Sequence, residues 1–239
     1  ETRTSTYVGL AIIVVALAVR GAICFHDVHQ YLESDVDDYR AIAETLSKSG
    51  VYGFTQDTGV VPTARRPPLY PIILSFLVLN GSLSAYLVAG LHSLLGCVTV
   101  FFVYRASRQM LREIDSHRGS MLASLLVLVD PILLRQCTQV MTETLATALV
   151  SVILWWWARH AVWTASIGKN VTLGILLSLA FFCRPTFLVW AGMFCVFVVF
   201  AKPYHYSKGR DLIGRGVLLA ATVGLPIGYW MIRNYQALG

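Results

Sequence analysis

Residues Tyr7–Cys24 read YVGLAIIVVALAVRGAIC, an apolar run long enough to form one helix across a membrane. Such a helix needs roughly 20 apolar residues, because the hydrocarbon core of a bilayer is about 30 Å thick. The whole chain has the same character, since 56% of its 239 residues are hydrophobic and 13% are charged. Soluble domains need roughly 25% charged residues to cover their surface. The composition therefore predicts an integral membrane protein without a soluble domain.

Five further apolar segments follow the first one. Their lengths, and the polar break at Arg184-Pro185 inside one of them, predict an all-α membrane protein with about seven transmembrane helices. The segments are Ala85–Tyr104, Ser120–Leu134, Leu145–Ala158, Leu173–Cys183 continuing to Ala201, and Gly216–Ile232.

Basic residues gather between alternate apolar segments. Arg105–Arg118 and Lys202–Arg215 are two such connections, whereas most acids lie between the first two segments. Because Lys and Arg mark cytoplasmic loops, we expect a cytoplasmic N-terminus, with residues 26–66 and 67–81 outside. This is the arrangement of a multi-pass protein in a bacterial inner membrane, surrounded by membrane lipid. The net charge of +6 is spread over these short connections, so it does not indicate a nucleic-acid partner.

The outside segment has predicted elements of its own. Asp35–Lys48 has the composition of an amphipathic helix that lies on the membrane surface. Val51–Arg66 is rich in Gly and Thr and is predicted to be a loop. Ile72–Leu79 is too short to span and predicts a second surface helix. The expected boundaries are Ser34 as N-cap and Gly50 as end of the first helix, and Asn80-Gly81 as the turn after the second.

The most informative polar motif is Asp35-Val36-Asp37-Asp38-Tyr39. On a helix, Asp35, Asp38 and Tyr39 would share one face, because residues three and four apart are neighbours there. Two close carboxylates suit a general base or a cation site. The alternative is an ordinary acidic helix start that faces water. No resident metal or other cofactor is predicted, and a divalent cation stays open as an occupant of this acid pair.

Glu143 and several arginines lie at the outward ends of the apolar segments. Because charges at membrane depth are costly, they tend to be functional or paired, and both a second acidic site and a salt bridge fit Glu143. Guanidinium groups on one side can bind a phosphate through paired hydrogen bonds. Their alternative role is to extend their charge to the membrane interface. These arginines are Arg65, Arg66, Arg135, Arg184 and Arg233.

Seven short motifs follow one another along nearly the whole chain. They are Asp35-Val36-Asp37-Asp38-Tyr39 with Ala41 and Ala43, Gly50-Val51-Tyr52-Gly53-Phe54, Arg66-Pro67-Pro68-Leu69-Tyr70-Pro71, Asp130-Pro131, Thr142-Glu143-Thr144-Leu145, Arg184-Pro185-Thr186 and Trp230-Met231-Ile232-Arg233-Asn234-Tyr235. In order and spacing, this set resembles the GT-C glycosyltransferases, in the branch related to protein O-mannosyltransferases and the lipid A aminoarabinose transferase.

The resemblance implies an enzyme that moves a sugar from a polyprenyl-phosphate carrier to an acceptor on the outer face of the membrane. Asp35 would be the general base or would orient the acceptor hydroxyl, with Asp38 as a second candidate and Glu143 as the second acidic site. Tyr39, Tyr70 and the five arginines named above would contact the substrate. Family members usually continue beyond this length, so the chain would correspond to their N-terminal module.

The sequence is also compatible with two other classes of function. A non-catalytic membrane subunit would keep this scaffold within a larger complex and would co-purify with its protein partners. A transporter would place broken helices and ionisable groups near the bilayer midplane, whereas the acids of this chain gather on one side. The transporter is therefore the least favoured of the three, and the sequence names neither the sugar nor the acceptor.

Overall fold

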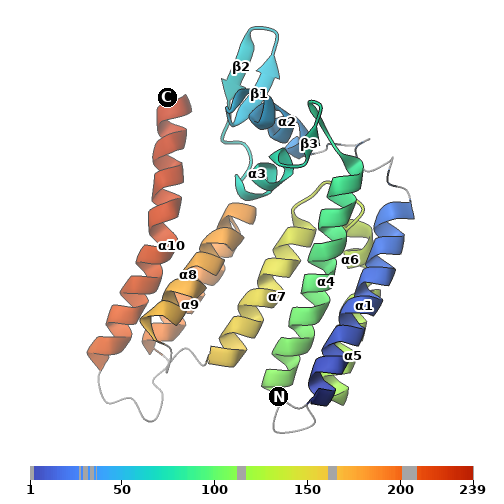
Figure 1. The fold of residues 1–239 in the computed structure, drawn as a ribbon. Coiled ribbons are helices and arrows are strands. Elements are labelled where there is room, and N and C mark those ends of the chain that lie inside the picture. Colours follow the sequence, from blue (N-terminus) through green and yellow to red (C-terminus); the bar gives the residue numbers. More distant parts are fainter. Residues whose placement is uncertain are drawn as a thin grey trace.

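The computed structural model describes residues 3–26, 28, 32, 35, 37–111, 117–160, 166–200 and 209–238. It is mostly helical and consists of a helix bundle with a small cap at one end (Figure 1). The bundle contains α1 (Arg3–His26), α4 (Ala85–Met110), α5 (Arg118–Val129), α6 (Pro131–Gln136), α7 (Glu143–His160), α8 (Ile167–Cys183), α9 (Phe187–Phe200) and α10 (Gly209–Leu238). The cap contains α2 (Tyr39–Ser49), α3 (Leu69–Ser75), and the strand pairs β1 (Gly53–Gln56) with β2 (Gly59–Pro62) and β3 (Val78–Leu79) with β4 (Ser82–Leu83).

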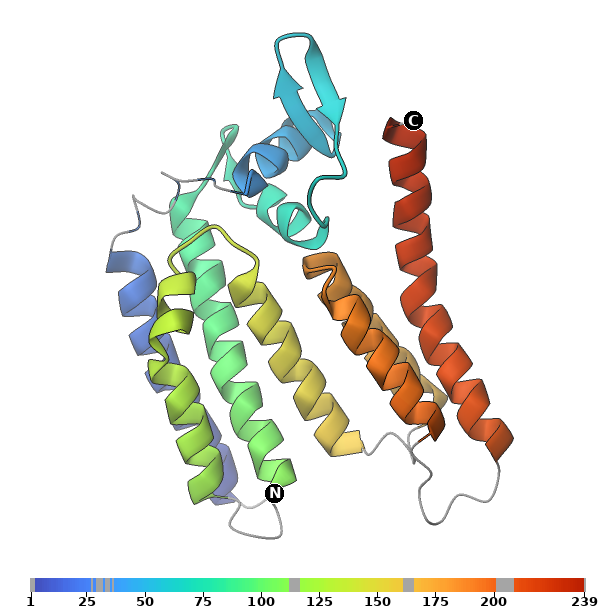
Figure 2. The same cartoon turned by 180° about the vertical axis from the view of Figure 1, so that it is seen from behind.

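The bundle helices lie side by side and run alternately toward and away from the cap (Figures 1 and 2). Helix α4 contacts α1, α5 and α7, whereas α10 contacts α8 and α9. The N-terminal end of the chain lies away from the cap, and the C-terminal end lies on the same side as the cap. Helices α4 and α7 begin beside the cap and end at the opposite end of the bundle.

In the part of the chain that the structure describes, the apolar segments predicted from the sequence are helical apart from the breaks at Asp130 and at Arg184-Pro185-Thr186. Within the described residues, three helices are long and apolar enough to cross a membrane, namely Tyr7–His26, Ala85–Met110 and Ile213–Leu238. Helices α5, α8 and α9 are apolar but shorter. Large apolar side chains such as Leu122 and Leu225 are exposed on the bundle surface, as lipid contact would require. The structure therefore suggests a membrane protein, while seven spans stay a prediction.

Asp130 and Pro131 divide the predicted segment Ser120–Leu134 into α5 and α6. Oδ1 of Asp130 accepts hydrogen bonds from the N–H groups of Ile132 and Leu133, both at 2.9 Å, and so caps α6. Pro131 stands in the first turn of α6, where its missing N–H needs no partner. The chain therefore turns at the cap side of the bundle instead of continuing as one helix.

The first helix of the cap begins later than the sequence predicts, at Tyr39 rather than Asp35. Asp38 stands before it with φ 62°, a left-handed conformation that does not continue into a right-handed helix. The prediction that Asp35, Asp38 and Tyr39 share a helical face is therefore wrong. The predicted N-cap, Ser34, lies outside the described residues. The apolar face of α2 packs against α3.

The predicted end of the first cap helix at Gly50 is confirmed. Gly50 ends α2 with φ 71°, and its N–H donates to the carbonyl of Leu46. The second helix, α3, spans Leu69–Ser75 and not the predicted Ile72–Leu79, because Val78 and Leu79 form strand β3 before the turn at Asn80-Gly81. Asn80 and Gly81 both have positive φ and connect β3 to β4. This is the two-residue hairpin turn that an Asn-Gly pair favours.

The segment Val51–Arg66 is not the predicted loop. It contains the antiparallel hairpin β1–β2, in which Gly53 pairs with Pro62 and Gln56 with Gly59. The predicted all-α class is therefore corrected: the described residues form a mostly helical fold with two small hairpins. The strands lack the alternation of apolar and polar residues that would predict them. Contacts of β1 with α2 contribute to holding the hairpin in place.

Helix α8 packs closely on α10 at Gly174. A Cβ atom there would lie 2.7 Å from both Cβ and Cγ2 of Thr222, closer than real contacts allow. Gly174→Ala should therefore lower the free energy of unfolding by about 1–3 kcal/mol, which a lower Tm in detergent would reveal. Gly168→Ala on the same helix is the control, because its Cβ would have nothing within 4 Å. Equal Tm values for the two variants would contradict the close packing.

Candidate functional site

Asp35 lies at the N-terminal end of α2 and is half-buried. Its Oδ1 accepts a hydrogen bond from the N–H of Arg40 at 3.1 Å, and its Oδ2 accepts one from the N–H of Ala41 at 3.0 Å. Both amides belong to the first turn, where they have no partner within the helix. Each carboxylate oxygen keeps a further lone pair. The two bonds therefore fix the orientation of Asp35 and leave it able to accept a proton.

The other two acids of the motif are paired with arginines. Arg66 donates to Asp37 through Nε to the carbonyl oxygen at 2.8 Å and through Nη2 to Oδ1 at 2.6 Å. Nη1 of Arg65 lies 2.7 Å from Oδ2 of Asp38, a charge contact without the alignment of a hydrogen bond. Arg65 is largely exposed, so this pair contributes little to stability. Asp38 therefore balances the charge of Arg65.

Tyr39 and Tyr70 bring α2 and α3 together above the bundle. Their rings meet edge to face, with centroids 5.2 Å apart. The guanidinium of Arg66 lies 5.5 Å from the centre of the Tyr39 ring, at cation–π distance. The hydroxyl of Tyr70 lies 2.8 Å from Nε2 of His92, on α4. The two tyrosines thus connect the acidic motif to the bundle.

Tyr70 lies within electrostatic range of both predicted acidic sites, Asp35 and Glu143. Burial raises the pKa of its hydroxyl well above its ordinary value, and negative charge at Tyr39, Cys183, Glu143 and Asp35 would raise it further. Tyr70 therefore keeps its proton and is available only as a neutral hydroxyl. Asp35 and Glu143 lie on the same side of the molecule, because Asp35 binds α2 of the cap and Glu143 begins α7 at the end of the bundle that carries the cap (Figure 1).

Glu143 is the first residue of α7, at the end of the bundle that carries the cap. Its Oε1 accepts a hydrogen bond from Nη2 of Arg184 at 2.8 Å, and its side chain is only 13% exposed. Its Oε2 is buried and has no hydrogen-bond partner among the described residues. A buried carboxylate oxygen is costly to leave unpaired. This atom is therefore placed to meet a hydroxyl, a cation or another donor from outside the chain.

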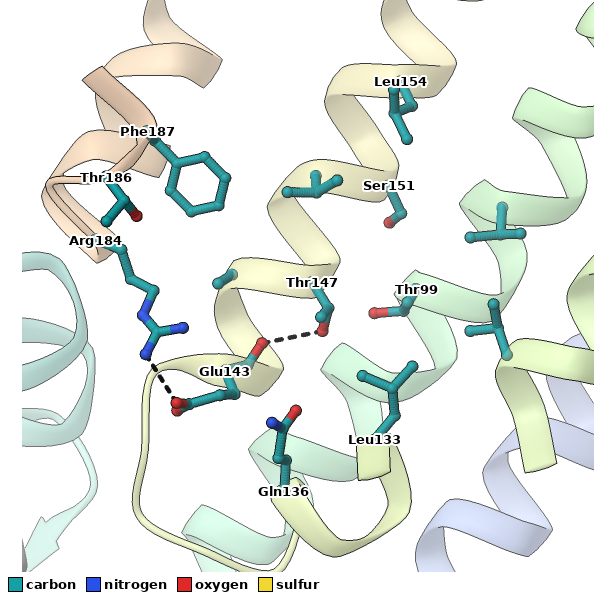
Figure 3. A pocket seen from close by; sticks show the side chains of 14 residues that line it. Thr99, Leu133, Gln136, Glu143, Thr147, Ser151, Leu154, Arg184, Thr186 and Phe187 are labelled. Carbon is teal, nitrogen blue, oxygen red and sulfur yellow. Dashed lines mark hydrogen bonds and ion pairs between the residues drawn. The ribbon is translucent and has the colours of Figure 1, made fainter. Parts of the chain in front are cut away.

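The Glu143–Arg184 pair stands at one end of a cleft of about 430 Å³. In Figure 3 the two side chains point toward one another, while Thr147, Ser151 and Leu154 follow along α7 away from them. The walls of the cleft are mainly apolar and come from α4, α5, α6, α7 and α9. The cleft thus joins an apolar channel within the bundle to a charged group beside the cap.

The remaining predicted arginines differ in their surroundings. Nη1 of Arg233, on α10, donates to the carbonyl of Thr63 at 2.9 Å, and Nη2 donates to that of Tyr52 at 3.1 Å. This guanidinium therefore holds the β1–β2 hairpin to α10. Arg135, at the end of α6, is exposed. No ion pair or side-chain hydrogen bond joins Arg135 to the other site residues in the described part of the chain.

The sequence-based prediction missed several residues of this region. His92 joins α4 to the cap through Tyr70, and its Nδ1 lies 3.0 Å from the carbonyl oxygen of Cys137. Arg20 is almost fully buried within α1, where its Nη2 donates to the carbonyl of Val127 at 2.8 Å. A usable signal existed for both, because ionisable residues inside apolar segments tend to be functional or specifically paired. Asp37 gave no separate signal within its acidic motif.

Within the described ranges, no group of three or more His, Cys, Asp or Glu side chains is placed to hold a metal ion. The arrangement instead offers an oriented carboxylate, a half-buried acid with an unpaired oxygen, and a guanidinium beside an apolar cleft. No protein-family model, no curated protein and no solved structure matches this chain, so its site is interpreted from geometry alone.

Proposed function

We propose that this chain is a membrane glycosyltransferase module that takes a sugar from a polyprenyl-phosphate carrier. The observation that carries the proposal is the apolar cleft that ends at the Glu143–Arg184 pair. A polyprenyl phosphate has a long apolar tail and an anionic head, so it needs a channel of this kind. The tail would lie between α7 and the neighbouring helices, and the phosphate would meet the guanidinium of Arg184.

The chemistry follows from the placement of the two acids. Asp35 accepts the proton of the acceptor hydroxyl, whose oxygen then bonds to the anomeric carbon of the sugar. The bond from that carbon to the carrier phosphate breaks, and the electron pair leaves with the phosphate. Arg184 stabilises the charge that develops there. Oε2 of Glu143 accepts a hydrogen bond from a sugar hydroxyl, and the anomeric configuration inverts.

The same proposal includes seven membrane crossings with the cap on the outer face. Helix α4 begins beside the cap and ends near Arg105 and Arg108, and α7 begins at Glu143 and ends near Arg159. These basic residues thus lie at the end of the bundle away from the cap, the end that the distribution of Lys and Arg assigns to the cytoplasm. This topology fits the inner membrane of a bacterium, with the shorter helices α5, α8 and α9 also embedded.

A second candidate is a non-catalytic membrane subunit with the same scaffold. The observation in its favour is that three of the predicted phosphate-binding arginines have acidic partners within the chain. Arg65, Arg66 and Arg184 are each paired in this way. Arg233 binds backbone carbonyls. On this reading the ion pairs stabilise the cap and the bundle separately, Arg233 joins the two, and the cap side of the molecule contacts other proteins.

The cleft provides the experiment that tests the proposal. Val150 lines it on α7, and Val150→Trp would fill it with a ring. We expect the purified chain to bind undecaprenyl phosphate more tightly than the corresponding alcohol. We expect Val150→Trp to weaken binding of the phosphate by about 10–100-fold, since even small misfits in an apolar pocket cost that much. Native mass spectrometry in detergent measures both affinities.

Leu122→Trp is the control, because Leu122 is 59% exposed on α5 and does not line the cleft. This variant should bind the lipid like the wild type. If neither the wild type nor Leu122→Trp binds the lipid, the chain is not a polyprenyl-phosphate enzyme. Co-purification of stoichiometric protein partners would then support the subunit. Equal affinity of Val150→Trp and the wild type would place the carrier elsewhere.

A further inference from the structure

Two cysteines from distant parts of the chain meet beneath the cap. Cys24 lies near the end of α1, and Cys137 directly follows α6. Their Sγ atoms are 3.3 Å apart, although 113 positions separate the residues in the sequence. Both side chains are fully buried. Neither is in a disulfide in this structure.

The surroundings favour chemistry at Cys137. The guanidinium of Arg20 lies beside its sulfur and has no ion pair with an acid in the described part of the chain. A cation without an acidic partner stabilises a thiolate, which is the form of cysteine that attacks a disulfide. The Nε of Arg20 has no hydrogen-bond partner among the described residues. The Nε–H group of Arg20 can therefore donate a hydrogen bond to a thiolate at Cys137.

The backbone around the pair is held in place. The carbonyl of Cys137 lies 3.0 Å from Nδ1 of His92, which is itself bonded to Tyr70. A disulfide has an S–S distance of about 2.05 Å, so the two sulfurs need to approach by roughly 1.3 Å from their present contact of 3.3 Å. Side-chain rotation provides movements of this size without a new fold.

The other buried cysteines lack such a partner. Sγ of Cys183 donates to the carbonyl of Thr142 at 3.6 Å. No sulfur–sulfur contact involves Cys97, Cys183 or Cys195 in the described part of the chain. A metal is not the reason for the contact, since no group of three ligating side chains is present among the described residues. The Cys24–Cys137 pair is thus specific.

We propose that Cys24 and Cys137 form a disulfide that joins α1 to the connection between α6 and α7. Two S–H bonds are lost and one S–S bond forms. The two protons and two electrons pass to the disulfide of a thiol oxidant, which becomes two thiols. The inference rests on the proposed outward placement of the cap end, because disulfides persist in oxidising compartments. It does not depend on any sugar chemistry.

The disulfide also has a consequence for the site. Cys137 anchors His92 through its carbonyl, and His92 holds Tyr70. Fixing Cys137 to α1 therefore fixes the chain of contacts that positions the cap on the bundle. The bond would act as a covalent support for this part of the fold.

Trapping of thiols tests the proposal directly. Cells that express the full chain are lysed in acid, and the protein is denatured in SDS and labelled with N-ethylmaleimide before digestion. We expect a peptide pair joined through Cys24 and Cys137, with two hydrogens fewer than the separate thiols. Cys97 and Cys183 should carry the label. Full labelling of Cys24 and Cys137 would overturn the proposal, whether or not the chain binds polyprenyl phosphate.

Thermal unfolding gives an independent readout. Cys24→Ser, Cys137→Ser and the double variant remove the same bond, so all three should lose the same several degrees in Tm. Additive losses would indicate two separate packing defects instead and would contradict the disulfide. Cys97→Ser, a buried thiol without a sulfur partner, is the control for the loss of a thiol group alone.

Discussion

Asp35→Asn should lower the rate of sugar transfer by about 10²–10⁴-fold, the usual contribution of a general base. Asparagine keeps the shape of the side chain and one acceptor oxygen, so it can still accept a hydrogen bond from Arg40 or Ala41, the amides that Asp35 now caps. It cannot accept the proton of an acceptor hydroxyl. Transfer from a polyprenyl-phosphate-linked sugar, measured in membranes that contain the natural acceptor, reports the effect.

The control for this variant is Asp57→Asn, in the exposed turn of the β1–β2 hairpin. It removes one negative charge from the same cap and should leave transfer unchanged. A thermal unfolding curve for Asp35→Asn that matches the wild type separates the chemical effect from loss of the helix cap. Wild-type activity in Asp35→Asn would rule out Asp35 as the base and leave it as a structural cap.

Glu143→Gln should lower transfer by about 10²-fold, because an interaction made in the transition state in a poorly hydrated site is lost. Glutamine retains the length of the side chain and an oxygen that can accept from Arg184. It lacks the charge that now balances the guanidinium at 2.8 Å. Glutamine also replaces one of the two carboxylate oxygens of Glu143 by an amide NH₂ group. This group cannot accept a hydrogen bond from a sugar hydroxyl. Initial rates at saturating donor measure the loss.

A double-mutant cycle decides what Glu143 does. If the two residues form only a structural salt bridge, the double variant Glu143→Gln and Arg184→Gln should regain the wild-type rate and Tm. If Glu143 contacts the sugar, the double variant stays at least as slow as Glu143→Gln. Recovery of the wild-type rate would therefore reduce the pair to a structural salt bridge and remove both residues from the proposed catalytic site.

The helices of the bundle were predictable because they depend on local composition. Long apolar runs with basic ends become helices. The break at Asp130-Pro131 carries its own signal, because Asp favours the N-cap and Pro favours the first turn of a helix. The turn at Asn80-Gly81 was predictable for the same reason, because only such residues accept positive φ readily. The helices and this turn can be predicted without knowing which other parts of the chain they pack against.

The start of α2 and the β1–β2 hairpin depend on contacts that composition does not contain. Asp35 uses its side chain to bind the amides of α2, and so ends up before the helix instead of in it. The hairpin depends on packing against α2 and on the distant Arg233. Short strands such as these, which are stabilised by contacts with other elements, have no alternating pattern of apolar and polar residues to detect.

The individual charged residues of the site were predictable, but their pairing was not. Glu143 and Arg184 stand 41 positions apart and meet only because α7 and α8 pack side by side. Arg66 and Asp37 meet in the same way across the cap. Such pairs weaken the prediction of phosphate binding, because a guanidinium that already has an acidic partner is less available to a bound phosphate.

The bonds from Arg233 to the β1–β2 hairpin end on carbonyl oxygens of Tyr52 and Thr63, not on side chains. Every amino acid supplies a carbonyl, so position 63 can change its side chain through mutation without losing this attachment. The arginine itself has no substitute, because a lysine offers a single nitrogen that cannot reach both oxygens in a fixed fork. Sequence drift in this part of the protein should therefore concentrate on the hairpin and spare the helix that holds it.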